Sequence, residues 1–310
     1  TRFVWPRNRP VVYTAGMTED KRFAGIELGG TKIVCGIATG AGDVLERTSI
    51  PTRRPEETLI DIKTWLEPRL DDATALGIAS FGPIYVDPAS PRYGHIGATP
   101  KTAWQDFDLL ASIREWATLP TALDTDVNAA ALAEIRWGAA HGHDNVVYVT
   151  VGTGIGGGIV ANGRAVHGLM HPEIGHMKPR RLPDDDLGGL CPFHGDCFEG
   201  LAAGPAIRAR WGKPLNELPA DHPAYVMEAD YLGQLAVNLL LTASPTKLIF
   251  GGGVMNCTEL LPMIRDAAAR HLNDYLDLTN PSNAAEELIV TPGLESNAGL
   301  LGAVALVIDD

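Results

Sequence analysis

The sequence predicts an α/β protein of two similar halves that face a cleft. Each half opens with a buried strand, a glycine-rich turn and a second strand, once from Phe23 and once from Asn145. Each half then continues with helical segments and at least one more buried strand. With 310 residues and 45% hydrophobic content, the chain is long enough to bury cores in two domains of ordinary size.

The first half reads as a meander of strands followed by alternating helices and strands. Apolar runs indicate the strands, and the alanine-rich run after Asp126 favours a helix. We expect strands at 23–28, 33–38, 44–50, 75–81 and 121–124, and helices at 60–70, 106–118 and 127–141.

The second half repeats this opening. We expect strands at 145–151, after Gly158 and at 247–250, and helices at 205–211, 224–242, 259–273 and 297–307. The predicted domains are therefore 23–125 and 126–296, with the C-terminal helical segment 297–310 packing back on the first domain. Residues 1–22 are expected to form a disordered extension. Met17 is a candidate start, which leaves open whether 1–16 belong to the mature protein.

Composition excludes several classes of function. The net charge of −13 argues against a nucleic-acid partner, which would require concentrated Lys and Arg. The longest apolar runs are too short to cross a bilayer. Four unevenly spaced cysteines do not make a disulfide framework, which predicts a cytoplasmic enzyme without membrane partners.

A stretch of about thirty residues gathers the ligands that zinc prefers. Cys191, His194 and Cys197 lie three residues apart in turn, and His176 is the natural fourth ligand. Four protein ligands predict a closed, structural Zn²⁺ site in the loop 171–200. The alternative is that these are ordinary buried thiols and histidines.

Three glycine turns form the second signal, at 29–32, 152–158 and 251–253. Glycines without a Cβ let backbone N–H groups approach an anion closely, and Thr31 and Thr153 add hydroxyl donors. Any one of these turns could be a simple hairpin. Three of them at strand ends, in two repeated halves, favour phosphate binding.

The third signal is the sequence Leu-Asp-Thr-Asp-Val-Asn from Leu123 to Asn128. It predicts a strand that passes into a helix with Asp126 and Asn128 at the helix N-terminus, facing the cleft. There the helix dipole should keep the Asp126 carboxylate ionised, so that it can accept a proton from an alcohol. The alternative is that Asp126 merely caps the helix.

These motifs resemble the ROK family of sugar kinases, within the group that shares the actin, hexokinase and Hsp70 ATPase fold. The similarity is greatest to bacterial fructokinases. The motifs that carry it are G-I-E-L-G-G-T-K, S-F-G-P-I, T-P-K-T-A-W, H-P-E-I-G-H and C-P-F-H-G-D-C-F-E-G. The resemblance implies a two-domain ATPase fold with a cleft, MgATP and a hexose as substrates, one structural Zn²⁺ per chain and a homodimer.

The resemblance also assigns roles to individual residues. It implies that Asp126 is the general base that accepts the proton of the sugar 6-hydroxyl. Sugar-binding residues would be Gly82, Asn128, Glu173, His176 and Glu199. Phosphate- and nucleotide-binding residues would be Gly29, Gly30, Thr31, Lys32, Thr153, Gly154, Gly252 and Gly253, and the zinc ligands would be His176, Cys191, His194 and Cys197.

The chain departs from the family pattern at two places. Most relatives have three thiolates in C-x-C-G-x-x-G-C, whereas this chain offers two cysteines and two histidines. Glu27 stands where the larger superfamily has Asp, so we expect at most an indirect contact with magnesium. Which hexose is preferred stays open between fructose, glucose, mannose and N-acetylated hexosamines. Sugar-responsive regulators of the same family carry a helix-turn-helix segment, which is not expected here.

Overall fold

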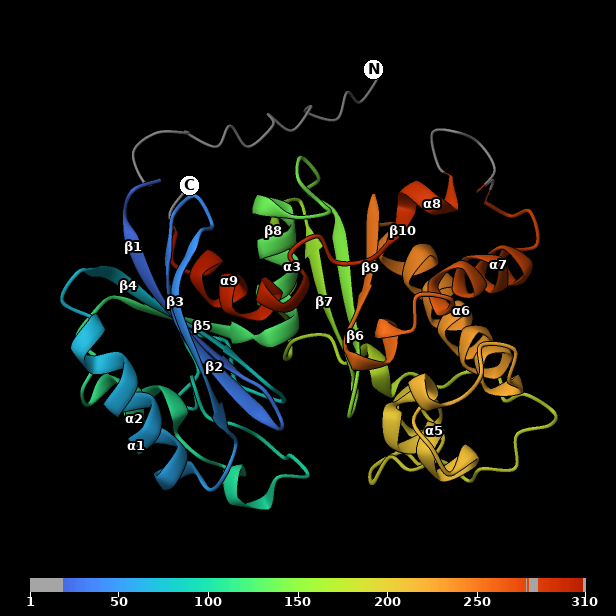
Figure 1. Cartoon of the computed structure of the whole chain (residues 1–310), viewed down its shortest axis with the longest axis horizontal. Coiled ribbons are helices and arrows are strands. Elements are labelled where there is room, and N and C mark those ends of the chain that lie inside the picture. Colours follow the sequence, from blue (N-terminus) through green and yellow to red (C-terminus); the bar gives the residue numbers. More distant parts are fainter. Residues whose placement is uncertain (1–18, 277, 279–283, 309–310) are drawn as a thin grey trace.

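The computed structural model describes residues 19–276, 278 and 284–308. It contains two five-stranded mixed sheets with strand orders β3-β2-β1-β4-β5 and β10-β9-β6-β7-β8 (Figure 1). Most of the predicted N-terminal extension, residues 1–18, lies outside the described residues, as do 309–310. Within the described part, the first strand begins at Arg22, one residue before the predicted start.

The first sheet places three chain segments side by side at one edge. Strand β1 pairs parallel with β4, and β4 pairs parallel with β5, with Leu28, Ser80 and Thr125 in register. Because parallel strands end at the same edge, the residues that follow these three positions lie next to one another. The strands are β1 (Arg22–Leu28), β2 (Lys32–Thr39), β3 (Val44–Pro51), β4 (Ala73–Ser80) and β5 (Thr121–Thr125).

Two helices cover the outer face of this sheet, α1 (Pro55–Leu66) and α2 (Leu109–Arg114) (Figure 1). Helix α1 begins five residues earlier than predicted because Pro55 occupies its first turn, where proline is favoured. Helix α2 is shorter than the predicted 106–118, since Asp108 caps it by accepting a hydrogen bond from the Ala111 N–H.

The second sheet repeats the pattern. Strand β6 pairs antiparallel with β7 and parallel with β9, with Thr150 opposite Gly251. Its strands are β6 (Val146–Val151), β7 (Ile155–Ala161), β8 (Arg164–Ala165), β9 (Lys247–Gly251) and β10 (Ile289–Val290). The helices of this half are α4 (Phe198–Ala202), α5 (Gly204–Trp211), α6 (Pro223–Ala243), α7 (Leu260–Leu272) and α8 (Ala285–Leu288).

The predicted glycine turn 152–158 is too long by four residues. Strand β7 begins at Ile155 and includes Gly156, Gly157 and Gly158. These glycines allow close packing against the strand: a Cβ on Gly158 would lie 2.2 Å from the Val127 carbonyl oxygen, and one on Gly157 would lie 2.2 Å from Ile174 Cδ1. Here glycine serves packing, and the turn itself is confined to 152–154.

Helices α3 (Asp126–Trp137) and α9 (Ala298–Ala305) lie between the two sheets (Figure 1). Helix α9 packs against β1, β2 and β4, while α3 contacts α9, β6 and β7. The contact is close because glycines line it. A Cβ on Gly77 would lie 1.7 Å from the Ala303 carbonyl oxygen, and one on Gly302 would lie 2.6 Å from the carbonyl carbon of Ala129.

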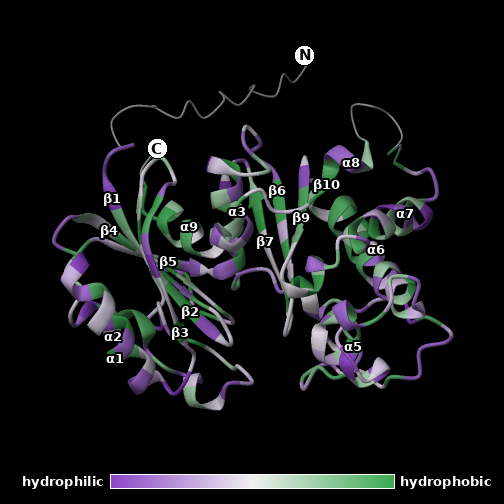
Figure 2. Cartoon of the chain, in the orientation of Figure 1, coloured by the Kyte–Doolittle hydropathy of each residue, from purple (hydrophilic) through white to green (hydrophobic). Residues whose placement is uncertain are grey.

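Each sheet has its own apolar core. One cluster includes Ile26, Leu28, Leu76, Ile78 and Trp104 and covers the helix side of the first sheet. A second, larger cluster joins the second sheet to α6 and α7. Figure 2 shows this as hydrophobic strands flanked by helices with hydrophilic outer faces. Within the described ranges, none of the helices combines the length and the apolar character that a membrane span requires.

Candidate functional site

Asp126 is the first residue of α3, directly after the end of β5. The helix is capped by the preceding residue: Thr125 Oγ1 accepts a hydrogen bond from the Asn128 N–H at 3.1 Å. Asp126 Oδ1 accepts a hydrogen bond from its neighbour, the Val127 N–H, at 2.9 Å. The interpretation of Asp126 as the helix cap is therefore wrong, because Thr125 is the residue that caps the helix.

The charge state of Asp126 differs from the one predicted. Burial, the Glu27 carboxylate and, more weakly, Glu173 raise the pKa of Asp126 to about 7, although the helix N-terminus and the Val127 N–H oppose this shift. The effect of the helix dipole, which we expected to keep the group ionised, is outweighed first by burial and then by the two nearby acids. A carboxylate with a pKa near neutrality is suited to act as a general base.

Asn128 lies in a buried polar network that the sequence did not indicate. Its Nδ2 donates to Asp124 Oδ1 at 2.8 Å, and the other Asp124 oxygen lies 2.9 Å from His167 Nε2. This contact raises the pKa of His167. Asn128 Oδ1 is buried without a hydrogen-bond partner among the described residues. Asp124 and His167 were missed because nothing in the sequence relates positions 43 residues apart.

Segments of the two halves meet at Gly82. A Cβ on Gly82 would lie 3.1 Å from His171 Cε1 and 3.5 Å from Glu173 Oε1. The His171 ring also accepts a hydrogen bond from the Ile84 N–H at 3.2 Å. Partial burial and the Glu199 carboxylate raise the pKa of Glu173 to about 7. The structure thus brings Gly82, Asp126 and Glu173 together, as expected for one site.

Glu199 has a contact that the sequence did not predict. Its Oε2 accepts a hydrogen bond from the Ile155 N–H at 3.1 Å, and a Cβ on Gly154 would lie 2.5 Å from the same oxygen. Glu199 lies in the first turn of the short helix α4, whose N-cap is the zinc-ligand candidate Cys197. The carboxylate therefore connects that cluster to the 152–154 turn.

The first glycine turn is a tight hairpin between β1 and β2. The Gly29 N–H donates to the Lys32 carbonyl at 3.1 Å, and Thr52 Oγ1 donates to the Gly29 carbonyl at 2.8 Å. Thr31 and Lys32 are exposed beside it. The Lys32 charge partly offsets the effect of burial, which raises the pKa of Glu27.

The other two glycine turns lie together at the edge of the second sheet. Strands β6 and β9 are parallel neighbours, so the 152–154 turn and Gly252–Gly253 follow adjacent strand ends. Gly252 has a φ of +93°, and a Cβ there would lie 2.4 Å from the Val151 carbonyl oxygen. Gly253 has no atom within 4 Å of its Cβ position, and so it leaves open space for a ligand.

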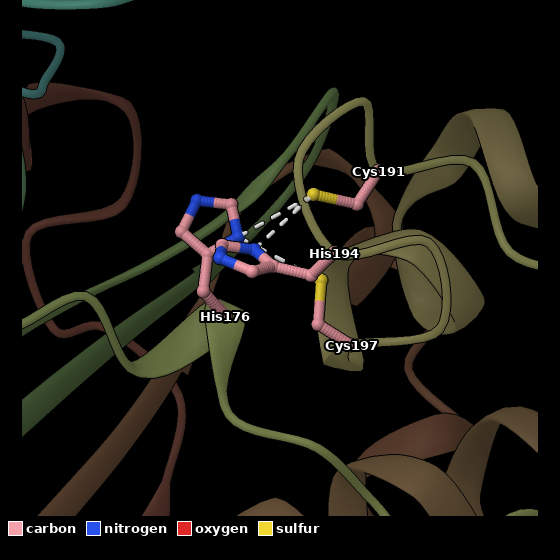
Figure 3. Close-up of side chains that lie close together, drawn as sticks. All are labelled: His176, Cys191, His194 and Cys197. Atoms are coloured by element: carbon pink, nitrogen blue, oxygen red, sulfur yellow. Dashed lines mark hydrogen bonds between the residues drawn. The ribbon is translucent and has the colours of Figure 1, made fainter.

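His176, Cys191, His194 and Cys197 form one cluster, with one ligand atom from each within 4.8 Å of all the others (Figure 3). Cys191 Sγ lies 3.6 Å from Nδ1 of both His176 and His194, and Cys197 Sγ lies 3.6 Å from His176 Nδ1. The knuckle between the cysteines is closed by paired backbone hydrogen bonds of Cys191 and Gly195.

These distances fit a tetrahedral metal ion. With Zn–S of about 2.3 Å and Zn–N of about 2.0–2.1 Å, sulfur and nitrogen in a tetrahedron lie about 3.5–3.6 Å apart. Both cysteines are buried free thiols, and both histidines present Nδ1 to the same point. The four residues therefore form a group that could hold Zn²⁺. His176 Nε2 points away from the cluster and has no hydrogen bond among the described residues.

The chain is similar to known proteins over nearly its whole length. The ROK family model matches residues 23–310. The chain is 45% identical to a fructokinase of Zymomonas mobilis over 94% of this chain and 98% of that protein. It is 42% identical to a fructokinase of Pediococcus pentosaceus over 91% of this chain and 96% of that protein.

The fold is also found among solved structures. The ROK hexokinase from Thermus thermophilus superposes with a TM-score of 0.71 at 28% identity, covering 92% of this chain and 97% of that one. The family model and the two relatives span nearly the whole chain, as the resemblance of the motifs implied. The chain belongs to the ROK family.

Proposed function

We propose that this protein is a fructokinase that transfers the γ-phosphoryl group of MgATP to the 6-hydroxyl of a hexose, with fructose preferred. The observation that supports it most strongly is the position of Asp126, a carboxylate with a pKa of about 7 at the start of α3, near Glu27 and Glu173. The names of the two relatives above favour fructose over glucose or mannose.

Asp126 is proposed as the general base. Its carboxylate would accept the proton of the 6-hydroxyl while the sugar oxygen attacks phosphorus in line and ADP departs. A pKa near neutrality leaves a large ionised fraction at pH 7 and still makes the group basic enough to take the proton.

The hexose site is proposed between Gly82, Glu173 and His176, with Asn128 at its floor. Gly82 leaves room for the sugar because it has no side chain, and Glu173 lies beside it. His176 would use Nδ1 for the metal and keep Nε2 for a sugar hydroxyl. Glu199 would also bind a sugar hydroxyl. Its present hydrogen bond to the Ile155 N–H would be either kept or exchanged for that hydroxyl.

The glycine turns are proposed to bind the nucleotide. Gly29, Gly30, Thr31 and Lys32 would contact phosphate from the first sheet, and Thr153 and Gly154 from the second. Gly252 and Gly253 would lie against the adenosine, because the second glycine leaves open space. Magnesium would accompany ATP as part of the substrate, with Glu27 near but not bound to it.

Zinc is proposed to have a structural role. His176, Cys191, His194 and Cys197 would hold it, and a site with four protein ligands has no open position for water. Because His176 and Glu199 belong to the same folded loop, the metal would fix both relative to the glycine turn at 152–154.

We also propose that the chain divides into two domains. The first consists of residues 23–125 and the C-terminal helix, and the second of residues 126–296. The second proposal is that the protein is a homodimer in the cytoplasm. The packing of α9 on β1 and β4 supports the first of these. Size-exclusion chromatography with light scattering tests the second: a mass equal to that of one chain would contradict it.

A coupled ADP-release assay tests the proposed function. Purified protein is assayed with fructose, glucose, mannose and N-acetylhexosamines, each with ATP and with other nucleoside triphosphates. The expected result is sugar-dependent ADP release that is fastest with fructose, and NMR should locate the new phosphate on O6. Sugar binding without ADP release would instead indicate a sugar-sensing regulator, and release with glucose alone would assign a glucokinase.

A further inference from the structure

Lys101 lies on the connection between β4 and α2, on a short segment with a fixed backbone. The segment is anchored by Trp104, whose ring is buried and packs edge-to-face against Phe81 and Phe107. The indole N–H donates to the Arg53 carbonyl at 2.8 Å, and the Trp104 backbone N–H donates to the Lys101 carbonyl at 2.8 Å. The Lys101 backbone is therefore held three residues from a core anchor.

The Lys101 side chain extends over the first glycine turn. A Cβ added to Gly30 would lie 3.3 Å from Lys101 Cε and 3.9 Å from its Nζ. The absence of a side chain at Gly30 thus lets the ammonium group lie directly beside the backbone of this turn. Gly30 and Lys101 belong to two separate motifs, G-I-E-L-G-G-T-K and T-P-K-T-A-W, and the fold brings these motifs together.

The ammonium group of Lys101 has no carboxylate partner within the described part of the chain. Other lysines do: Lys63 pairs with Glu67, and Lys178 pairs with Asp196. The protein as a whole carries a net charge of −13, and Glu27, Asp126 and Glu173 lie in this region. A cation held at a glycine turn without an acidic partner is suited to an anionic ligand.

The position of Lys101 relative to Asp126 follows from the sheet. Gly30 comes after β1, Gly82 after β4 and Asp126 after β5, and these strands are parallel neighbours in register. Adjacent strands lie about 4.8 Å apart. Lys101 and the proposed base are therefore at the same sheet edge, on either side of the strand end that carries Gly82.

We propose that Lys101 binds the phosphoryl group that is transferred, an inference that rests on the proposed kinase function. The bond from sugar O6 to phosphorus forms, the bond from phosphorus to the bridging oxygen of ADP breaks with its electron pair on ADP, and the hydroxyl proton moves to Asp126. Throughout, the Lys101 ammonium donates to non-bridging phosphoryl oxygens, first on ATP and then on the sugar phosphate.

The test compares Lys101→Met, which keeps the length of the side chain and removes the charge, with Lys101→Arg. Lys63→Met is the matched control, because it removes an exposed lysine on α1. For each protein, kcat and the two KM values are measured, and calorimetry gives the affinities for fructose 6-phosphate and for free fructose. Lys101→Gln provides a second uncharged variant if the methionine variant folds poorly.

Lys101→Met should lower kcat by about 10²-fold and weaken sugar-phosphate binding by about 10-fold or more, with free-sugar affinity within about twofold of the wild type. Lys101→Arg should restore much of the sugar-phosphate affinity. Lys63→Met should match the wild type in every measurement.

Two results would overturn the inference. One is an uncharged variant with the kcat and sugar-phosphate affinity of the wild type. The other is an equal loss of affinity for sugar and sugar phosphate, which would mean that Lys101 contacts the sugar itself. Failure of the proposed function is distinguishable, because the wild-type protein would then release no ADP with any hexose.

Discussion

Replacing Asp126 by Asn should abolish most catalysis and at the same time stabilise the folded protein. Asparagine keeps the shape of the side chain and an oxygen that can accept the hydrogen bond from the Val127 N–H. In the wild-type protein this hydrogen bond to Asp126 Oδ1 is 2.9 Å long. It removes only the charge and the proton-accepting oxygen. We expect kcat to fall by about 10²-fold or more, because a general base contributes about that factor.

The gain in stability follows from the pKa of Asp126, which is about 7 in the folded protein against an ordinary value of 3.8. Between these values the folded chain holds a proton that the unfolded chain has released, so stability falls as pH rises through this window. The difference between the folded and unfolded pKa values of Asp126 lowers the free energy of unfolding by at most about 4 kcal/mol above pH 7. At pH 5 the loss is about 1–2 kcal/mol. Asparagine avoids this cost at every pH.

Thermal unfolding at several pH values provides the assay, together with ADP release. The melting temperature of Asp126→Asn should exceed that of the wild type, and the excess should grow by roughly 5–10 °C between pH 5 and pH 8. Asp221→Asn is the control, since Asp221 is exposed on the loop before α6. It should follow the wild type at each pH.

The reasoning is refuted if Asp126→Asn turns over at close to the wild-type rate, which would remove Asp126 from the chemistry. It is equally refuted if the variant gains nothing in melting temperature between pH 5 and pH 8. In that case the neighbouring acids would not oppose ionisation of Asp126 in the folded protein.

Three further predictions concern pH, backbone geometry and metal. The wild-type kcat/KM should rise with pH through about 7, because Asp126 and Glu173 both have pKa values raised to about 7. A pH profile in which kcat/KM rises near pH 4 instead would contradict this. Gly252→Ala should lower stability by about 1–3 kcal/mol, since the position has a φ of +93° and no room for a Cβ, whereas Gly253→Ala should be tolerated; equal melting temperatures for the two variants would contradict it. Removing metal with a chelator should lower the melting temperature and the sugar affinity together, and added Zn²⁺ should restore both; freshly purified protein without bound zinc would exclude a zinc site.

Local patterns predicted much of this site. The cysteine and histidine cluster was predictable because its four members fall within 22 residues, so a short folded loop brings them together whatever the rest of the chain does. The glycine turns predicted at 29–32 and 251–253 were largely right because each lies at a strand end, although Gly251 is still part of β9 and Lys32 already part of β2. The strand and helix pattern also predicted the longer elements of both halves, with errors at their ends, but it missed the short elements α4, α8, β8 and β10.

Other features were missed for a physical reason that the glycines of β7 illustrate. Glycine permits both a turn and close packing, and the sequence does not distinguish them. Gly156, Gly157 and Gly158 were interpreted as a turn, although they lie in a strand against α3 and Ile174. In the same way, the sequence indicated Asn128 as a cleft residue but not that its side chain is buried against Asp124.

The sequence by itself determined which groups are available: four side chains that could hold a metal, three glycine-rich turns and an acid at the start of a helix. Only the tertiary structure decided their chemical state. The pKa of Asp126 depends on Glu27 and Glu173, and the place of Lys101 depends on Gly30, all of them distant along the chain. Electrostatic and steric effects act through space over a few ångströms, and sequence separation does not report such distances.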